Sequence, residues 1–147
     1  MKRMDLHTIA LIDDVIARFF AAFDNRNGRI PGIECFESLF AATSVVASHS
    51  DPLAVICTAE EFARPRIDLL SSGRLVDFHE WETEAENQVI GSLAVRRSRY
   101  AKSGRLDGQP YAGTGTKFFQ LARMEDKWRI VALSWADDVD HRRSSPA

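Results

Sequence analysis

A histidine next to carboxylates is the first candidate for acid–base chemistry in this sequence. Asp77, His79 and Trp81 alternate with other residues in a segment of period two, so their side chains point to one side of an extended strand. If the tryptophan lines a cavity, the other two residues line it as well. Burial beside a charge can move the pKa of either group towards neutrality. We therefore predict His79 and Asp77 as catalytic residues and Trp81 as a ligand contact.

Four further residues are candidates for contacting a ligand. Tyr100 can donate its hydroxyl to a substrate carbonyl oxygen. In the basic run 96–99, alternation sends Arg97 to one face and its two neighbours to the other, so one arginine can face the cavity and bind a carboxylate. Trp135 and Asp137 share one face of the last predicted strand. We predict all four as ligand-binding residues.

Each kind of candidate also has a purely structural interpretation. A histidine such as His79 can bond within the sheet or lie at its rim. Arg97 can form an ion pair with a glutamate of the neighbouring strand. Most tyrosines pack their ring and leave the hydroxyl in water. The sequence leaves both interpretations open.

Patterns typical of metal, nucleotide or cofactor sites are not found. His49 and His79 do not have the helical spacing of paired metal ligands. The glycines of the run 113–116 precede a predicted strand rather than a helix, which indicates bends in a sheet and not a phosphate cradle. Cys35 and Cys57 lie among apolar residues and are predicted to be small buried hydrophobic side chains. We expect no metal and no cofactor.

The composition is that of a globular protein without attraction to polyanions. The 147 residues include 19 basic and 21 acidic side chains, which leave a formal charge of -2. This balance disfavours nucleic acid as a partner. No segment approaches the roughly 20 apolar residues that cross a bilayer, and Asp13 and Asp14 interrupt the apolar stretch that a secretory signal would need. We expect a cytoplasmic protein with no nucleic-acid or membrane partner.

The N-terminal half of the chain predicts three helices. From Leu6 to Phe23, apolar residues recur at spacings of three and four, which is typical of a helix with one buried stripe. Residues 33–40 repeat this pattern in a second, shorter helix. Residues 58–61 have the spacing of a capping box and begin a third helix, with a kink or a restart at Pro65.

The rest of the chain predicts an antiparallel sheet. Two short β-prone runs, 45–49 and 53–57, flank a turn and predict a hairpin. Beyond Gly73 the period changes to two, and four long strands are expected at about 75–84, 93–101, 115–124 and 128–136. Strands of this length must coil. We predict an α+β fold in which three N-terminal helices pack in the concave face of a strongly curved, mostly antiparallel sheet.

Several segments carry a resemblance to a known superfamily. They are 19–24 (FFAAFD), 78–82 (FHEWE), 91–95 (GSLAV), 118–121 (FFQL) and 127–135 (KWRIVALSW). With the order of elements over about residues 6–138, they resemble the nuclear transport factor 2-like superfamily, and the closing hairpin resembles its SnoaL-like branch. The resemblance implies a single cone-shaped domain over residues 1–138 and a homodimer formed through the outer face of the sheet. The composition of the last residues predicts a disordered tail over 139–147.

The resemblance implies a fold and leaves the reaction open, because isomerases, cyclases, dehydratases, ligand carriers and association domains share it. One function is a cofactor-independent isomerase, cyclase or dehydratase that acts on a hydrophobic or carboxylated small molecule in the cone cavity. The alternative is a non-catalytic domain for ligand binding or protein association. Whether the protein is an enzyme stays open at this point.

Overall fold

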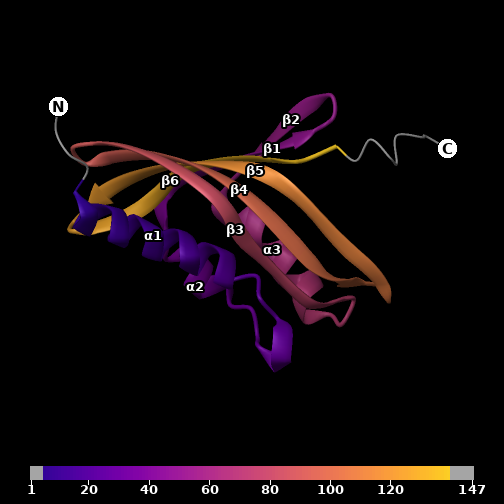
Figure 1. Cartoon of the computed structure of the whole chain (residues 1–147). Coiled ribbons are helices and arrows are strands. Elements are labelled where there is room, and N and C mark those ends of the chain that lie inside the picture. Colours follow the sequence, from indigo (N-terminus) through magenta and orange to yellow (C-terminus); the bar gives the residue numbers. More distant parts are fainter. Residues whose placement is uncertain (1–4, 140–147) are drawn as a thin grey trace.

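The computed structural model describes residues 5–139 (Figure 1). The chain forms helix α1 (Leu6–Ala21), a 3-10 helix η1 (Arg26–Gly28), helix α2 (Ile33–Glu37) and helix α3 (Ala59–Ser71). The expected tail, apart from Val139, lies outside the described residues. No helix in this part of the chain is long and apolar enough to span a membrane.

Six strands form one sheet in the order β2-β1-β6-β5-β4-β3. Their bounds are β1 Phe40–Ser50, β2 Leu53–Cys57, β3 Leu75–Ile90, β4 Leu93–Leu106, β5 Gln109–Met124 and β6 Lys127–Asp137. The pairing is antiparallel except between β1 and β6. Figure 1 shows the sheet arching over the three helices, which lie on its concave side. The predicted α+β fold is confirmed.

Two of the predicted helices differ in detail. The second ends at Glu37 rather than at residue 40, because Phe40 already pairs with Ile130 as the first residue of β1. The third continues from Ala59 to Ser71 with Pro65 inside it, so the helix does not restart there. Cys35 is exposed and Cys57 is half-buried, so the prediction that both are buried was wrong. Only Phe36 of the short helix α2 is buried.

Aromatic rings hold α1 and α2 against the sheet. The buried side of α1 includes Ile12, Ile16 and Phe19. The ring of Phe19 lies 5.1 Å from that of Phe119 on β5 and 5.6 Å from that of Phe36 on α2, measured between ring centres. This core fills the concave face under α1 and α2. The part of that face next to α3 is left for a cavity.

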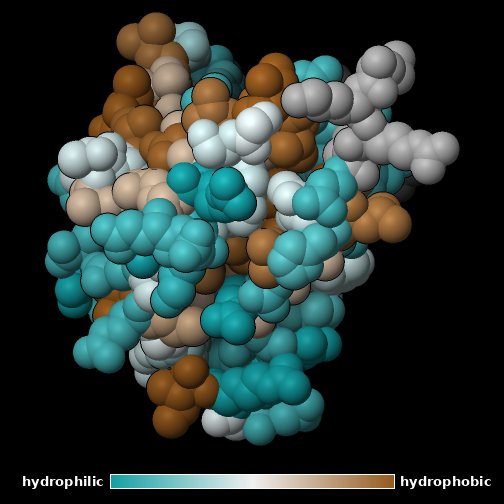
Figure 2. Space-filling model, turned by 90° about the vertical axis from the view of Figure 1, so that its left-hand side faces the viewer, coloured by the Kyte–Doolittle hydropathy of each residue, from teal (hydrophilic) through white to brown (hydrophobic). Residues whose placement is uncertain are grey.

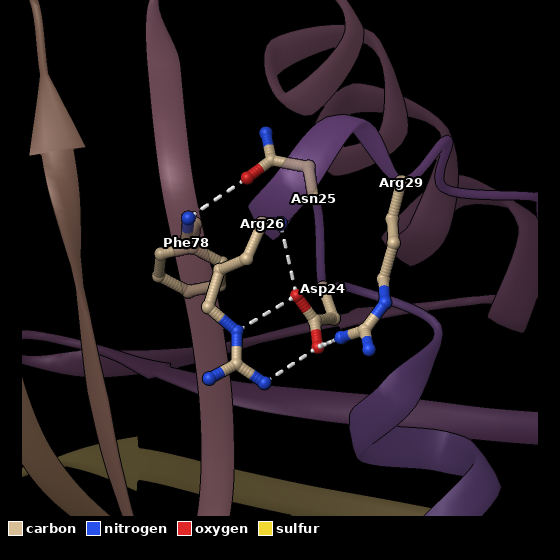
Figure 3. Close-up of polar contacts among 5 residues, drawn as sticks. All are labelled: Asp24, Asn25, Arg26, Arg29 and Phe78. Carbon is tan, nitrogen blue, oxygen red and sulfur yellow. Dashed lines mark hydrogen bonds and ion pairs between the residues drawn. The ribbon is translucent and has the colours of Figure 1, made fainter.

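Asn25 joins the end of α1 to β3 and α3. Its side-chain amide donates to the carbonyl oxygens of Leu70, at 3.0 Å, and Leu75, at 2.8 Å, and its amide oxygen accepts from the backbone N–H of Phe78 at 2.8 Å. Figure 3 shows the last of these bonds. Because Phe78 also lines the cavity, Asn25 fixes one wall of it.

Next to Asn25, a carboxylate closes the turn that follows α1. Asp24 accepts hydrogen bonds from the side chain of Arg26, at 2.8 and 3.0 Å, and from Arg29 at 2.6 Å (Figure 3). The bond from Arg26 lowers the pKa of Asp24 far below its usual value, although burial acts in the opposite direction. Asp24 therefore stays ionised and holds the turn.

The two sides of the curved sheet differ in their cover. Helices cover the concave side, whereas no helix of residues 5–139 lies over the convex side (Figure 1). Figure 2 views the molecule from the end at which α1 begins. Apolar residues gather along its upper edge, and mostly polar and charged residues cover its lower part. The convex side therefore carries exposed apolar surface.

Candidate functional site

A cavity of about 270 Å³ lies between α3 and the concave face of the sheet. Most of its wall is apolar or aromatic and comes from Phe23, Phe62, Pro65, Leu69, Leu70, Leu75, Phe78, Tyr111 and Trp135. Such a lining around a few polar groups is typical of a site for a small molecule, and the volume is at the small end of that range.

Six polar side chains reach this cavity from α3 and four strands. They are Arg66 of α3, Glu80 of β3, Tyr100 and Lys102 of β4, Lys117 of β5 and Asp137 of β6. Three are basic and two are carboxylic acids, so the formal charge of the lining is +1 when all five are ionised. Most of these groups stand on long strands, which hold them more firmly than loops would. An anionic or electron-rich ligand suits this balance.

Lys117 is the most deeply buried charged group of the cavity. Its side chain is 4% exposed, and its Nζ lies 3.4 Å from Oε1 of Glu80, whose side chain is 15% exposed. The Nζ also lies 4.0 Å from the centre of the Tyr100 ring and 5.0 Å from that of Trp135. Burial lowers the pKa of Lys117, and the charge of Glu80 only partly opposes this.

Tyr100, Asp137 and Lys102 form a second polar cluster. The hydroxyl of Tyr100 donates to Oδ1 of Asp137, and Nζ of Lys102 donates to Oδ2 of the same carboxylate at 2.8 Å. Burial and the bond to Asp137 raise the pKa of Tyr100, which therefore stays protonated. Burial alone would lower the pKa of Lys102, but Asp137 raises it overall, so Lys102 stays an ammonium ion.

Arg66 covers the cavity from α3. Its Nη1 donates to the carbonyl oxygen of Phe62 at 2.9 Å, and its guanidinium carbon lies 4.0 Å from the centre of the Phe62 ring. Burial lowers the pKa of Arg66, yet a guanidinium remains charged at any ordinary pH. Arg66 therefore supplies a fixed positive charge.

Gly115 makes room for the tyrosine cluster. Register places it between Tyr100 of β4 and Asp137 of β6. A Cβ atom at this position would lie 2.2 Å from the hydroxyl oxygen of Tyr100 and 2.5 Å from the carbonyl oxygen of Ala136. The absence of a side chain at Gly115 is what allows Tyr100 to reach Asp137.

Metal ligands do not cluster in the structure. Within residues 5–139, no group of three or more His, Cys, Asp or Glu residues is placed to hold a metal ion. The chemistry available at this site is that of an ammonium group, a carboxylate and a hydrogen-bonded phenol.

Solved structures match nearly the whole chain. An NTF2-like protein from Cytophaga hutchinsonii aligns with a TM-score of 0.67 and 16% identity, over 92% of this chain and all of that one. The chain has the nuclear transport factor 2-like fold. The hexachlorocyclohexane dehydrochlorinase LinA-type3 from Novosphingobium barchaimii aligns with a TM-score of 0.72 and 14% identity, over 91% of this chain and 88% of that one.

A third similar structure has a fold that is called cystatin-like. A protein of unknown function with a cystatin-like fold from Nostoc punctiforme aligns with a TM-score of 0.71 and 16% identity, over 99% of this chain and 98% of that one. No protein-family model matches the sequence, and no curated protein matches it. At these identities the likeness establishes the nuclear transport factor 2-like fold and no reaction.

Three of the predicted site residues line the cavity of this nuclear transport factor 2-like fold. They are Tyr100, Trp135 and Asp137. Arg97 does not, because its side chain points to the convex side, where it lies 3.8 Å from Glu86. Its neighbour Arg96 faces the concave side, but Glu82 and Asp13 bind it outside the cavity.

Asp77, His79 and Trp81 lie outside the cavity, so their predicted placement was wrong. The rings of His79 and Trp81 stack at 4.4 Å and line a shallow groove between α1 and the edge strand β3. Asp77 is exposed in a left-handed conformation, with φ of 51°, where the pairing of β3 with β4 is irregular. This bulge changes the phase of the strand. Phe78 and Glu80 face the cavity instead.

The environment of His79 differs from the one predicted. Burial, followed by the positive charge of Arg26, lowers its pKa. No carboxylate raises it enough to offset these effects. At neutral pH the imidazole is therefore uncharged and stacks on Trp81.

The sequence prediction missed four charged side chains of the cavity: Arg66, Glu80, Lys102 and Lys117. For Lys117 a signal was present, because alternation places it on the same face as Phe119 and Leu121, which are buried. A charge on an apolar strand face indicates a paired or functional group. Lys102 likewise shares a face with Tyr100. Arg66 and Glu80 carried no such signal.

Proposed function

We propose that the protein is a cofactor-independent enzyme of the isomerase, cyclase or dehydratase kind, which moves a proton on a small hydrophobic molecule bearing a carbonyl or carboxylate group. One observation carries the proposal. The carboxylate of Glu80 meets the ammonium group of Lys117 at 3.4 Å inside a mostly apolar cavity. An acid and a base held together away from water are what proton transfer at a carbon atom requires.

Glu80 is assigned the role of general base. Its Oε1 is buried and has no hydrogen-bond partner among the described residues, since the contact with Lys117 lacks hydrogen-bond geometry. This oxygen is free to accept a proton from a carbon atom next to a carbonyl group. A base in this position removes the proton that isomerisation, cyclisation and elimination have in common.

The basic side chains are assigned to the oxygen of the substrate. Removal of a proton next to a carbonyl group places negative charge on the carbonyl oxygen. Lys102 lines the cavity as an ammonium ion, and Arg66 adds a second fixed cation from α3. Fixed charges in a water-poor site stabilise such an oxyanion more strongly than they would in water.

The likeness to solved structures supports this class of reaction. One protein of the same fold is a hexachlorocyclohexane dehydrochlorinase, which is an elimination enzyme by name. That activity belongs to that protein. It supports the proposal because this fold carries an elimination reaction there.

The test is proton exchange at a carbon atom. The protein is incubated in D₂O with a set of small aromatic and alicyclic ketones, and deuterium next to the carbonyl group is followed by NMR. We expect exchange with the unaltered protein and a loss of about 10²–10⁴-fold in Glu80→Gln. Glu84→Gln is the matched control, because Glu84 lies on the same strand and is exposed.

The same ketones are screened for thermal stabilisation, since a ligand that binds only the native state raises Tm. Stabilisation without exchange would contradict catalysis and favour the non-catalytic ligand-binding domain. Neither exchange nor stabilisation across the set would favour a protein-association domain.

A further inference from the structure

Lys117 stands out among the groups of the cavity because it is a primary amine in an apolar wall. Its side chain is 4% exposed, and aromatic rings lie on two sides of its Nζ, at 4.0 Å for Tyr100 and 5.0 Å for Trp135. We propose that Lys117 forms an imine with the carbonyl carbon of an aldehyde or ketone bound in the cavity. This inference rests on the proposed function and names the substrate class of the same site.

Imine formation requires an amine that loses its proton readily. An apolar wall disfavours the ammonium form, and burial lowers the pKa of Lys117 accordingly. Lys102 lines the same cavity, but Asp137 holds its Nζ at 2.8 Å and raises its pKa. The two lysines therefore differ in reactivity, and the geometry selects Lys117 as the nucleophile.

Glu80 is placed to handle the protons of this reaction. Its Oε1 lies 3.4 Å from Nζ of Lys117 and first accepts a proton from the ammonium group. The neutral amine then attacks the carbonyl carbon, a C–N bond forms, and a proton moves from nitrogen to oxygen to give a carbinolamine. Glu80 returns its proton to the hydroxyl group, which leaves as water. A protonated imine and the Glu80 carboxylate remain, so atoms and charge balance and no oxidant is needed.

The residues around Lys117 stabilise the protonated imine. A protonated imine keeps one positive charge at the position of the ammonium group. The faces of aromatic rings and the carboxylate of Glu80 stabilise that charge. The imine also withdraws electrons from the neighbouring carbon, so the proton that Glu80 removes in the proposed reaction becomes more acidic.

Reductive trapping tests the imine. The protein is incubated with benzaldehyde and sodium cyanoborohydride at neutral pH, and peptides are mapped by mass spectrometry. We expect a benzyl group on Lys117 in preference to Lys102 and to the exposed Lys127. Because the neutral fraction of an amine rises as its pKa falls, we expect labelling of Lys117 to exceed that of Lys127.

Two lysine variants give the comparison. Lys117→Met is expected to abolish the preferred adduct, and Lys127→Met, at an exposed position outside the cavity, to retain it. Circular dichroism checks that both are folded, and the peptide map of the unaltered protein decides the question if either is not. Equal labelling of Lys117 and Lys127, or preferred labelling elsewhere, would overturn the proposal.

The outcome separates this inference from the proposed function. Deuterium exchange that depends on Glu80, without an adduct on Lys117, would overturn the imine and leave the proposed proton transfer standing. A preferred adduct on Lys117 without exchange would support the imine and overturn the proposed proton transfer.

Discussion

The Nζ of Lys117 and Oε1 of Glu80 lie 3.4 Å apart in the wall of the cavity, with the lysine side chain almost fully buried. Burying an ion pair has a desolvation cost that the attraction between the charges does not always repay. Because the pKa of Lys117 is lowered despite its partner, the cost prevails here. We expect the double variant Lys117→Met/Glu80→Met, which replaces the whole pair with apolar side chains, to raise the free energy of unfolding by about 1–4 kcal/mol at pH 7, measured by chemical denaturation. Lys117→Met alone should lower it, because the buried carboxylate of Glu80 then has no partner.

The pH dependence of this gain has a definite sign. Since the folded protein binds the lysine proton less readily than the unfolded chain, its stability rises with pH between the lowered pKa and the ordinary lysine value of about 10.4. The advantage of the double variant is thus largest below this window and shrinks as pH rises through it. Lys127→Met at an exposed position is the control. A gain that is independent of pH would contradict the prediction.

Gly115 is expected to tolerate no side chain. In Gly115→Ala the new methyl group would overlap the hydroxyl oxygen of Tyr100, at 2.2 Å, and a backbone carbonyl oxygen, at 2.5 Å. We expect a loss of about 1–3 kcal/mol of stability, which is typical of overpacking, together with weaker binding of any cavity ligand. Gly113→Ala is the control, because its Cβ would meet only the flexible end of Lys102, at 3.3 Å. Equal losses in both variants, measured by denaturation, would argue against this role.

Features that depend on local hydrogen bonds were predictable from the sequence. The capping box is an example, because Thr58 and Glu61 bond to each other's backbone N–H groups within one turn, at 3.1 and 2.8 Å. The succession of strands along the chain was equally clear, because the four long strands have a period of two and the two short ones are β-prone runs around a turn. On β6 the alternation placed Trp135 and Asp137 together on the face that lines the cavity. On β4 it did not decide the inward face, since the predicted Arg97 and Tyr100 lie on opposite faces and only Tyr100 lines the cavity.

It was not predictable from the sequence which side chains of β3 face the cavity. A bulge at Asp77 adds a residue that leaves no mark in the hydrophobic period, and one added residue sends every side chain beyond it to the other face. Trp81 then looks like a cavity residue in the sequence, although it lies at the edge of the sheet with His79. The contact of Glu80 with Lys117 joins two residues that are 37 positions apart in the chain, and it depends on which side chains of β3 face the cavity.

Asn25 is expected to be a major contributor to stability outside the cavity. Its side chain makes three hydrogen bonds to backbone groups of Leu70, Leu75 and Phe78. Removing them in Asn25→Ala leaves partly buried backbone groups without partners, so we expect a loss of about 2–4 kcal/mol in the free energy of unfolding. Gln88→Ala, at an exposed position, should change stability little. A loss as small as that of the control would contradict the prediction.

Asp24 is expected to make stability sensitive to acid. Its folded pKa is depressed by the bond from Arg26, so its contribution is fully present above the ordinary aspartate value of about 3.9 and is lost as pH falls below it. Asp24→Asn should therefore be less stable than the unaltered protein at pH 7, and the difference should narrow below about pH 4. Asp14→Asn is the control, because its ion pair with Arg18 is exposed. Denaturation at several pH values measures both.

The convex side of the sheet is the surface on which we expect a second copy of the chain. Phe118 is 49% exposed and Val95 is 42% exposed there. Arg97 and Glu86 lie beside them with opposite charge, so a two-fold axis would bring each arginine towards the glutamate of the other copy. This self-complementary arrangement favours a homodimer over a different partner.

Light scattering after size-exclusion chromatography tests the dimer. We expect the unaltered protein to have twice the mass of one chain and Phe118→Glu to have the mass of one, because a charge in an apolar contact is costly to bury. Ile30→Glu is the matched control, since Ile30 is equally apolar and more exposed but does not lie on the sheet. If Phe118→Glu remains a dimer while Ile30→Glu becomes a monomer, the contact lies elsewhere. A monomeric unaltered protein at micromolar concentration would rule the homodimer out, and the exposed Phe118 would then need another explanation.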